Sequence, residues 1–176
     1  MAKTLVFDTT PLIYLIKASL AEAPRKLHNQ KLLPESVYEE LMVGETQGRP
    51  EPAVIRELVE ETVFTLARTR STSLVKRLTK IADEDENKPL HRAEAEALAI
   101  AEELDGILIA DDHAARFTAK LMHVECHGTG YLLGRMYQEG QISRDEAITK
   151  LTEMRRAGWR LSEDDYRTIL DYFTTL

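Results

Sequence analysis

Acidic residues stand at the ends of separate apolar segments along this chain. They are Asp8 after residues 4–7, Glu40 within residues 37–41, Glu94 within residues 91–96, and Asp111 and Asp112 after residues 107–110. Carboxylates that gather at one place repel one another and raise each other's pKa, and a divalent cation relieves that repulsion. If the fold brings these acids together, the sequence predicts a site for Mg²⁺ or Mn²⁺.

The length and composition indicate one soluble globular unit. The chain has 176 residues, of which 43% are hydrophobic and 30% are charged. It contains no stretch rich in Gly, Ser or Pro that is long enough to be a linker. Because a chain of this length can bury one well-packed core, we expect it to fold unaided.

The charge pattern leaves two interpretations open. The formal net charge is -7, whereas binding to nucleic acid depends largely on Lys and Arg. The cations are unevenly spread, however, and one stretch holds five of them without an acid: Arg68, Arg70, Lys76, Arg77 and Lys80. Such a run indicates either a solvated helix face or a local contact for a polyanion.

Cysteine content and the N-terminal residues favour a cytoplasmic protein. Cys126 is the only cysteine, so an intrachain disulfide and a thiolate zinc site are both excluded. The first residues lack the length and cleavage pattern of a signal peptide. No segment approaches the roughly 20 apolar residues that a membrane span requires. We therefore expect no membrane association.

Short apolar strands alternate with helices over most of the chain. Strand-like runs lie at residues 4–7, 62–66, 107–110 and, more weakly, 123–126, with a further apolar run at 32–33. Helical patterns begin at residues 36 and 50 and span residues 71–81, 92–104 and 113–121, with a polar loop at 83–89. Ser36 and Glu39 have the spacing of a capping box. This alternation predicts a mainly parallel sheet covered on both faces, a three-layer α/β/α sandwich.

The C-terminal part of the chain is wholly helical in pattern. Helices are predicted at residues 131–138, 143–156 and 162–173, where Ser143 and Ser162 are good caps. Gly158 should end one helix, and Trp159 should pack between the last two. We therefore expect residues 1–140 to form the α/β domain and residues 141–176 a helical extension packed on it.

The strand order decides whether the acids meet. In an open parallel sheet, functional groups gather beyond the carboxyl ends of the strands. Asp8, Asp111 and Asp112 all follow strands, so they approach one another if their strands are neighbours. Glu40 and Glu94 would join them from helices that start at the same edge. Each acid alone has a simpler interpretation as a helix cap or a solvated residue.

Four segments in this order resemble the PIN domain family. They are Phe7-Asp-Thr-Thr-Pro-Leu-Ile13, Leu33-Pro-Glu-Ser-Val-Tyr-Glu-Glu-Leu41, Arg92-Ala-Glu-Ala-Glu-Ala-Leu-Ala99 and Ile107-Leu-Ile-Ala-Asp-Asp-His-Ala-Ala-Arg116. Residues 127–130 and 155–162 are similar to a VapC-like prokaryotic subgroup with a helical C-terminal extension. The resemblance covers nearly the whole chain, and it implies a five-stranded parallel sheet and a metal-dependent ribonuclease.

The resemblance also implies the site residues. The acids of the family fall on Asp8, Glu40, Glu94 and Asp112. This chain has Ala110 where the family usually has Ser or Thr, so Asp111 could share or replace the role of Asp112. Thr9 and Thr10 match the small hydroxyl residues that follow the first acid, although both could also cap a helix.

The hypothesis from sequence is that these acids hold Mg²⁺ or Mn²⁺ for the hydrolysis of RNA phosphodiester bonds. Arg116 would bind the substrate phosphate, or else form an ion pair with a nearby acid. The resemblance further implies a homodimer and, for a toxin, an antitoxin protein as partner. The alternative is a catalytically inactive PIN-fold module that binds RNA or protein.

Overall fold

A five-stranded parallel sheet forms the centre of the protein. The computed structural model describes residues 2–80 and 89–175. The strands are β1 (Leu5–Phe7), β2 (Lys31–Pro34), β3 (Thr65–Ala67), β4 (Ile107–Ile109) and β5 (Glu125–His127), in the order β3-β2-β1-β4-β5. All pairs are parallel, and Phe7 lies opposite Ile109. The sheet of the predicted sandwich is therefore confirmed.

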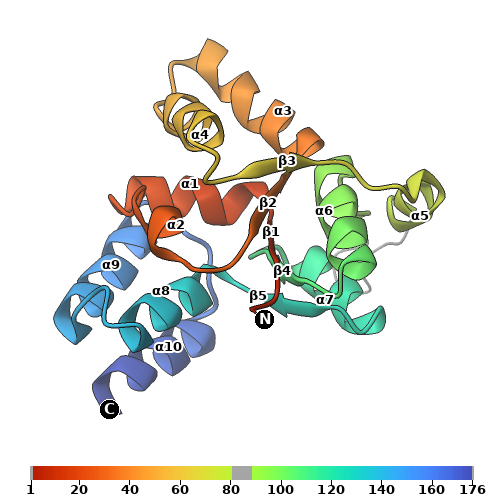
Figure 1. The fold of residues 1–176 in the computed structure, drawn as a ribbon. Helices are drawn as coiled ribbons and strands as arrows, with labels where there is room; N and C mark the ends of the chain where they lie inside the picture. The colour runs from red at the N-terminus through yellow and green to blue at the C-terminus, as the bar shows by residue number, and fades with distance from the viewer. Residues whose placement is uncertain (1, 81–88, 176) are drawn as a thin grey trace.

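Helices follow the strands along the chain (Figure 1). They are α1 (Thr9–Lys17), α2 (Ala23–Lys26), α3 (Glu35–Val43), the 3-10 helix η1 (Gly44–Gln47), α4 (Glu51–Glu60), α5 (Thr72–Leu78), α6 (Arg92–Glu103), α7 (His113–Leu121), α8 (Thr129–Gln138), α9 (Arg144–Arg156) and α10 (Glu163–Thr175). Within the described ranges, no helix combines the length and the apolar character needed to cross a bilayer.

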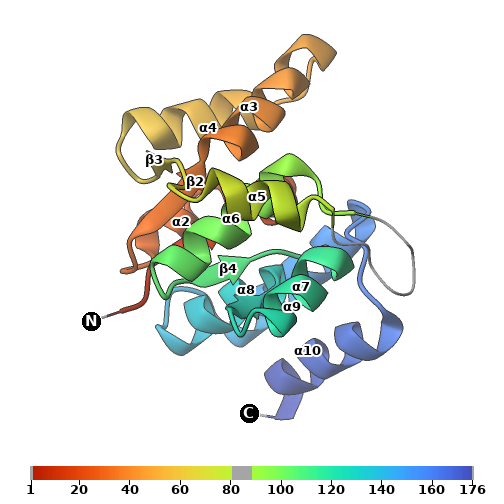
Figure 2. The ribbon, with the colours of Figure 1, turned by 90° about the vertical axis from the view of Figure 1, so that its right-hand side faces the viewer.

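The sheet separates two hydrophobic cores. Since side chains alternate along a strand, Leu5 and Phe7 of β1 pack in one core with residues of α1, α3, α4 and α8–α10. Val6 packs in the other core with residues of α5, α6 and α7. Figure 1 shows these two helical layers on either side of the sheet, and Figure 2 looks onto the layer of α5–α7. The three-layer α/β/α architecture is thus as predicted.

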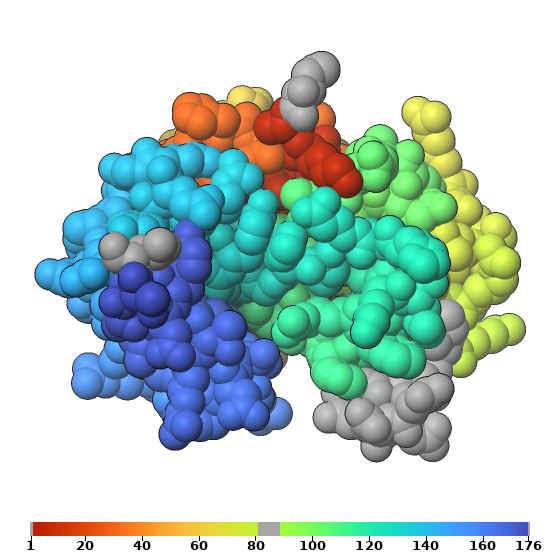
Figure 3. All heavy atoms as spheres, turned by 90° about the horizontal axis from the view of Figure 1, so that it is seen from below, coloured from red at the N-terminus to blue at the C-terminus, as the bar shows by residue number. Residues whose placement is uncertain are grey.

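The C-terminal helices pack closely on the body of the protein. Phe173 of α10 is fully buried and makes an edge contact with Tyr137 of α8, with ring centroids 5.8 Å apart. A Cβ atom at Gly130 would lie 2.6 Å from Cδ1 of Ile169, so the glycine lets α8 and α10 approach. Figure 3 shows these segments, in cyan to dark blue, beside α7. The division at residue 140 stays a prediction, because α9 and α10 share the core of the α/β part.

Two local predictions are wrong. The strand after α4 begins at Thr65 rather than Thr62, because residues 61–64 first turn out of the helix. Ser36 does not cap a helix through a capping box with Glu39, since α3 already begins at Glu35 and the Ser36 hydroxyl donates to Glu96. Most of the predicted 83–89 loop lies outside the described residues.

Candidate metal centre

Asp8 and Asp112 come together because their strands are neighbours. Asp8 directly follows β1, and its backbone N–H donates to the carbonyl oxygen of Ile109 in β4 at 2.9 Å. Ala110 then continues the line of β4, and the two acids Asp111 and Asp112 follow it. The register of β1 and β4 therefore places both chain segments at the same edge of the sheet.

Asp8 is the buried member of the acidic group. The residue is only 3% exposed, and it stands at the N-cap of α1 without making a cap hydrogen bond through its side chain. The pKa of Asp8 is raised from 3.8 to about 8, chiefly by burial and next by the negative charge of Glu94. The charges of Glu40 and Asp112 contribute to this rise, whereas a hydrogen bond from the backbone of Thr9 opposes it. Four carboxylates thus share one electrostatic environment.

Glu94 enters this environment from the first turn of α6. Burial raises its pKa, and the charges of Asp112 and Glu40 act in the same direction. The backbone N–H of His91 donates to Oε2 of Glu94 at 2.7 Å and partly offsets this effect. The carboxylate of Glu94 therefore belongs to the group, although it is turned toward the start of its own helix.

Thr9 and Thr10 have different surroundings. The hydroxyl of Thr9 donates to Oε2 of Glu40 at 3.0 Å and so holds that exposed carboxylate toward the start of α1. Thr10 lines a separate hollow of about 550 Å³ together with Lys17 and Arg49. Of the two hydroxyl residues, Thr9 is the one that contacts a candidate ligand.

Asp111 and Asp112 have separate partners. Oδ1 of Asp112 accepts hydrogen bonds from the backbone N–H groups of Ala114 at 2.8 Å and Ala115 at 3.2 Å, so Asp112 caps α7. The partners of Asp111 are the backbone N–H of Thr129 at 2.8 Å, the Thr129 hydroxyl at 2.5 Å and the Trp159 indole Nε1 at 2.9 Å. Asp111 therefore holds the C-terminal helices, and the sequence carried no sign of this contact.

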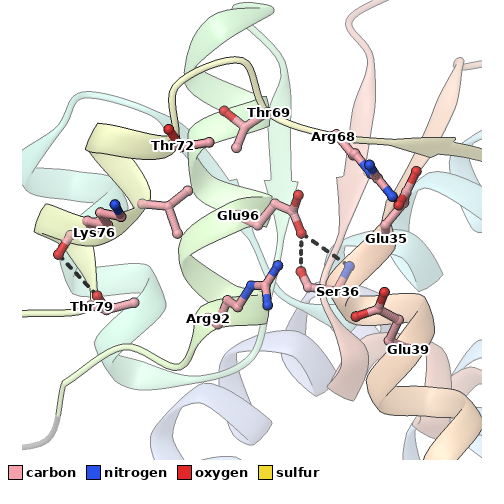
Figure 4. A pocket seen from close by; sticks show the side chains of 11 residues that line it. Glu35, Ser36, Glu39, Arg68, Thr69, Thr72, Lys76, Thr79, Arg92 and Glu96 are labelled. Carbon is pink, nitrogen blue, oxygen red and sulfur yellow. Dashed lines mark hydrogen bonds and ion pairs between the residues drawn. The ribbon is translucent and has the colours of Figure 1, made fainter.

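Glu96 makes a different contact from Glu94. Its Oε2 atom accepts hydrogen bonds from the backbone N–H of Ser36 at 3.1 Å and from the Ser36 hydroxyl, so Glu96 anchors the start of α3. Figure 4 shows Glu96 at a cavity of about 620 Å³ between α3, α5 and α6, with Arg68, Lys76 and Arg92 around it. The charge of Glu94 raises the pKa of Asp8, whereas Glu96 accepts hydrogen bonds from Ser36.

The predicted basic stretch and Arg116 all lie at the surface. The five cations of residues 68–80 are exposed, and Arg68 forms an ion pair with Glu35. This arrangement fits the solvated-face interpretation of the stretch. Arg116 is exposed on α7 and lines a hollow of about 150 Å³ with Asp111 and Tyr131. It is thus one turn of helix away from Asp112.

The donor set suits a divalent ion of the Mg²⁺ or Mn²⁺ type, because all four groups offer carboxylate oxygens. Across residues 2–80 and 89–175, no three His, Cys, Asp or Glu side chains are grouped as ready ligands. Glu40, Glu94 and Asp112 each accept a hydrogen bond from a local donor instead. A cation bound among these acids would offset their mutual repulsion and so favour the ionised form of Asp8, which its raised pKa otherwise disfavours.

The sheet thus has the order β3-β2-β1-β4-β5, and acids lie beyond the ends of its central strands β1 and β4. A family model described as PIN domain matches residues 4–174, and the chain belongs to the PIN domain family. PIN domains are generally nucleases and typically use divalent metal ions.

Among solved structures, the chain is similar to a domain of a functionally unknown protein from Methanocaldococcus jannaschii DSM 2661. The two share 20% sequence identity with a TM-score of 0.47, over 72% of this chain and 91% of the other. No curated protein matches the chain.

Proposed function

We propose that this protein is a metal-dependent ribonuclease whose Mg²⁺ or Mn²⁺ is held by Asp8, Glu40, Glu94 and Asp112. The observation that carries the proposal is the buried carboxyl of Asp8, whose pKa is raised to about 8 by burial and by the other three acids. A fold that gathers three carboxylates around a buried one gains stability when a cation binds there. Asp111 is left out of the ligand set, because its oxygens already accept three hydrogen bonds.

Different residues of the chain would have different roles in RNA hydrolysis. When bound, the metal ion would supply a nucleophilic water at neutral pH and stabilise charge on the phosphate. Thr9 positions Glu40 through its hydrogen bond, and the start of α7 positions Asp112. Arg116 would contact a substrate phosphate from the surface of α7, where a guanidinium can pair with two phosphate oxygens. Thr10 would contact the RNA beyond the scissile group.

The biological setting extends the same proposal. We infer a cytoplasmic VapC-like toxin that acts as a homodimer and is held inactive by an antitoxin protein. The family membership and the helical extension of residues 141–176 support this setting. Copurification of a separately encoded small protein that blocks RNA cleavage would test it, together with the mass of the free protein in solution.

Cleavage of single-stranded RNA in Mn²⁺ is the direct test of the enzymatic proposal. The wild-type protein should cleave with Mn²⁺ and lose activity in a chelator, and Asp8→Asn should be inactive under both conditions. Asp171→Asn changes an exposed acid of α10 and is the matched control. Full activity of Asp8→Asn would exclude the metal site.

The alternative function is a catalytically inactive PIN-fold module that binds RNA or protein. The hydrogen bonds that Glu94 and Asp112 accept from backbone N–H groups at the starts of α6 and α7 give both acids a structural role, and so favour this alternative. Wild-type protein that binds RNA but cleaves none, with either Mg²⁺ or Mn²⁺, would support this alternative over the enzyme.

A further inference from the structure

Glu51 is a buried acid that the proposed metal centre does not use. It is the first residue of α4 and is only 4% exposed, and its Oε2 atom has no hydrogen-bond partner among the described residues. The positive end of the α4 dipole lowers the cost of its charge. The dipole does not provide a donor for the oxygen, however, and a buried acceptor without a donor destabilises the fold. Glu51 is therefore a candidate for binding a ligand.

Two hollows meet at Glu51. One, of about 220 Å³, is lined by Thr9, Glu40 and Gln47 as well as by Glu51 and Arg49. The other is the hollow of about 550 Å³ at Thr10 and Lys17, which Arg49 and Glu51 also line. In Figure 1, α3 and α4 rise above α1, which carries the threonines. The smaller hollow is thus lined both by the candidate metal ligand Glu40 and by Glu51, whose Oε2 atom has no partner among the described residues.

The size and chemistry of the smaller hollow suit one nucleobase. Its volume is below the roughly 300 Å³ at which pockets for drug-sized ligands begin. Leu41 and Pro52 supply apolar wall, and the acid supplies two acceptor oxygens. Rotation about the last torsion of a glutamate side chain is soft, and such a turn would bring the buried Oε2 atom to the same ligand edge as Oε1. A ligand edge with two adjacent N–H donors is therefore the best match.

We propose that this hollow binds a guanine base of single-stranded RNA, with Glu51 accepting hydrogen bonds from N1–H and the 2-amino group. The proposal rests on the proposed ribonuclease function and names its specificity subsite. Adenine and cytosine offer a single exocyclic amino group beside an acceptor, and uracil offers one N–H between two acceptors. Sequence-specific binding to RNA commonly uses such unpaired bases, read on their Watson-Crick edges.

The cations at the second hollow would contact the RNA backbone beyond the bound base. Lys17 and Arg49 are both exposed; Arg49 lines both hollows, and Lys17 lines the larger one. A Cβ atom at Gly44 would lie 3.3 Å from Cδ of Arg49, so the glycine leaves room for the arginine stem. A strand with its scissile phosphate at the acids and its next base at Glu51 would place the following phosphate near these two cations.

Binding to short labelled RNAs separates this subsite from catalysis. The probes are uridine oligonucleotides with one central guanosine, inosine or adenosine, titrated by fluorescence anisotropy into Asp8→Asn protein in a chelator. Inosine lacks only the 2-amino group of guanosine. We expect the guanosine probe to bind about tenfold more tightly than the inosine and adenosine probes. Glu51→Gln should reduce this preference to less than about threefold, whereas Glu60→Gln, an exposed acid at the other end of α4, should leave it unchanged.

The outcomes separate the proposal of a guanine subsite from the proposal of ribonuclease activity. Equal binding of the three probes, or no binding, would overturn the guanine subsite, even if the wild-type protein cleaves RNA in Mn²⁺. A guanosine preference that depends on Glu51 would support the subsite even if no cleavage occurs and the enzymatic proposal fails. Because the inosine probe changes the RNA and not the protein, the comparison holds if Glu51→Gln fails to fold. Arg49→Gln should weaken binding of all probes alike and reduce its salt dependence.

Discussion

The indole Nε1 of Trp159 donates a hydrogen bond to Oδ2 of Asp111 at 2.9 Å, across 48 residues of sequence. Thr129 donates to the same carboxylate through its backbone and its hydroxyl. Asp111 thereby ties the end of β4 to α8 and to the turn between α9 and α10. Its neighbour Asp112 contributes instead to the charge around Asp8. Two adjacent aspartates thus serve a structural contact and a candidate chemical site.

Substitution of these two aspartates should separate stability from activity. Asp111→Asn exchanges an acceptor oxygen for an NH₂ group facing N–H and O–H donors, so the free energy of unfolding should fall by about 1–3 kcal/mol. Asp112→Asn should keep most of the stability, because asparagine also caps helices well, yet lose at least about a hundredfold in cleavage. Denaturant unfolding and the RNA assay measure both. The reverse pattern would assign the ligand role to Asp111.

The metal-free protein should become less stable as the pH rises. The pKa of Asp8 in the folded state is about 8, above its ordinary 3.8, so folding favours the protonated form. The contribution of Asp8 to the free energy of unfolding is therefore greatest below about pH 4. It falls by about 1.4 kcal/mol per pH unit until the pH passes 8. Thermal unfolding in a chelator should show this slope for the wild-type protein. Asp8→Asn should flatten most of it.

A divalent ion should reverse this loss. At pH 8, Mn²⁺ should raise the melting temperature of the wild-type protein, since an ion that binds only the folded state stabilises it. Asp8→Asn should respond much less. An equal response in both proteins would show that Mn²⁺ binds elsewhere.

Thr9 should act through Glu40. Thr9→Val keeps the shape of the side chain but removes the donor to Glu40 at 3.0 Å, so we expect a ten- to hundredfold loss of cleavage and weaker activation by Mn²⁺. Thr9→Ser keeps the hydroxyl and should restore most of the activity. Failure of the serine variant to recover would mean that the methyl group, and not the hydrogen bond, matters at this position.

Substitutions of Glu94 and Glu96, which lie in the first two turns of α6, should have opposite effects on stability and activity. Glu96→Ala leaves the buried hydroxyl and amide of Ser36 without an acceptor, and the free energy of unfolding should fall by about 1–3 kcal/mol. Glu94→Gln should abolish cleavage with little loss of stability. Comparison of Mn²⁺-dependent activity per folded molecule tests this. Equal losses of activity in both variants would contradict the separation.

Local patterns in the sequence were sufficient for the architecture. The apolar runs at residues 4–7 and 107–110 predict strands, and the alanine-rich segment from Arg92 predicts α6 within one residue of its end. Parallel pairing followed from the helices between the strands. Asp8 was assigned to a strand end, and Glu94 to a first helical turn, for the same reason: both positions depend on periodicity and on residues close in sequence.

Only the tertiary structure decided which partner each polar group takes. Ser36 has a capping-box partner three residues away, yet its hydroxyl donates to Glu96, 60 residues later, because α3 and α6 pack side by side. Asp111 and Asp112 are identical in sequence terms, and the packing of Trp159 and Thr129 separates them. Burial of Asp8, which raises its pKa, likewise depends on both neighbouring strands and on helices far along the chain. Sequence periodicity determined the elements of this protein, whereas long-range packing set the charge and partners of its acids.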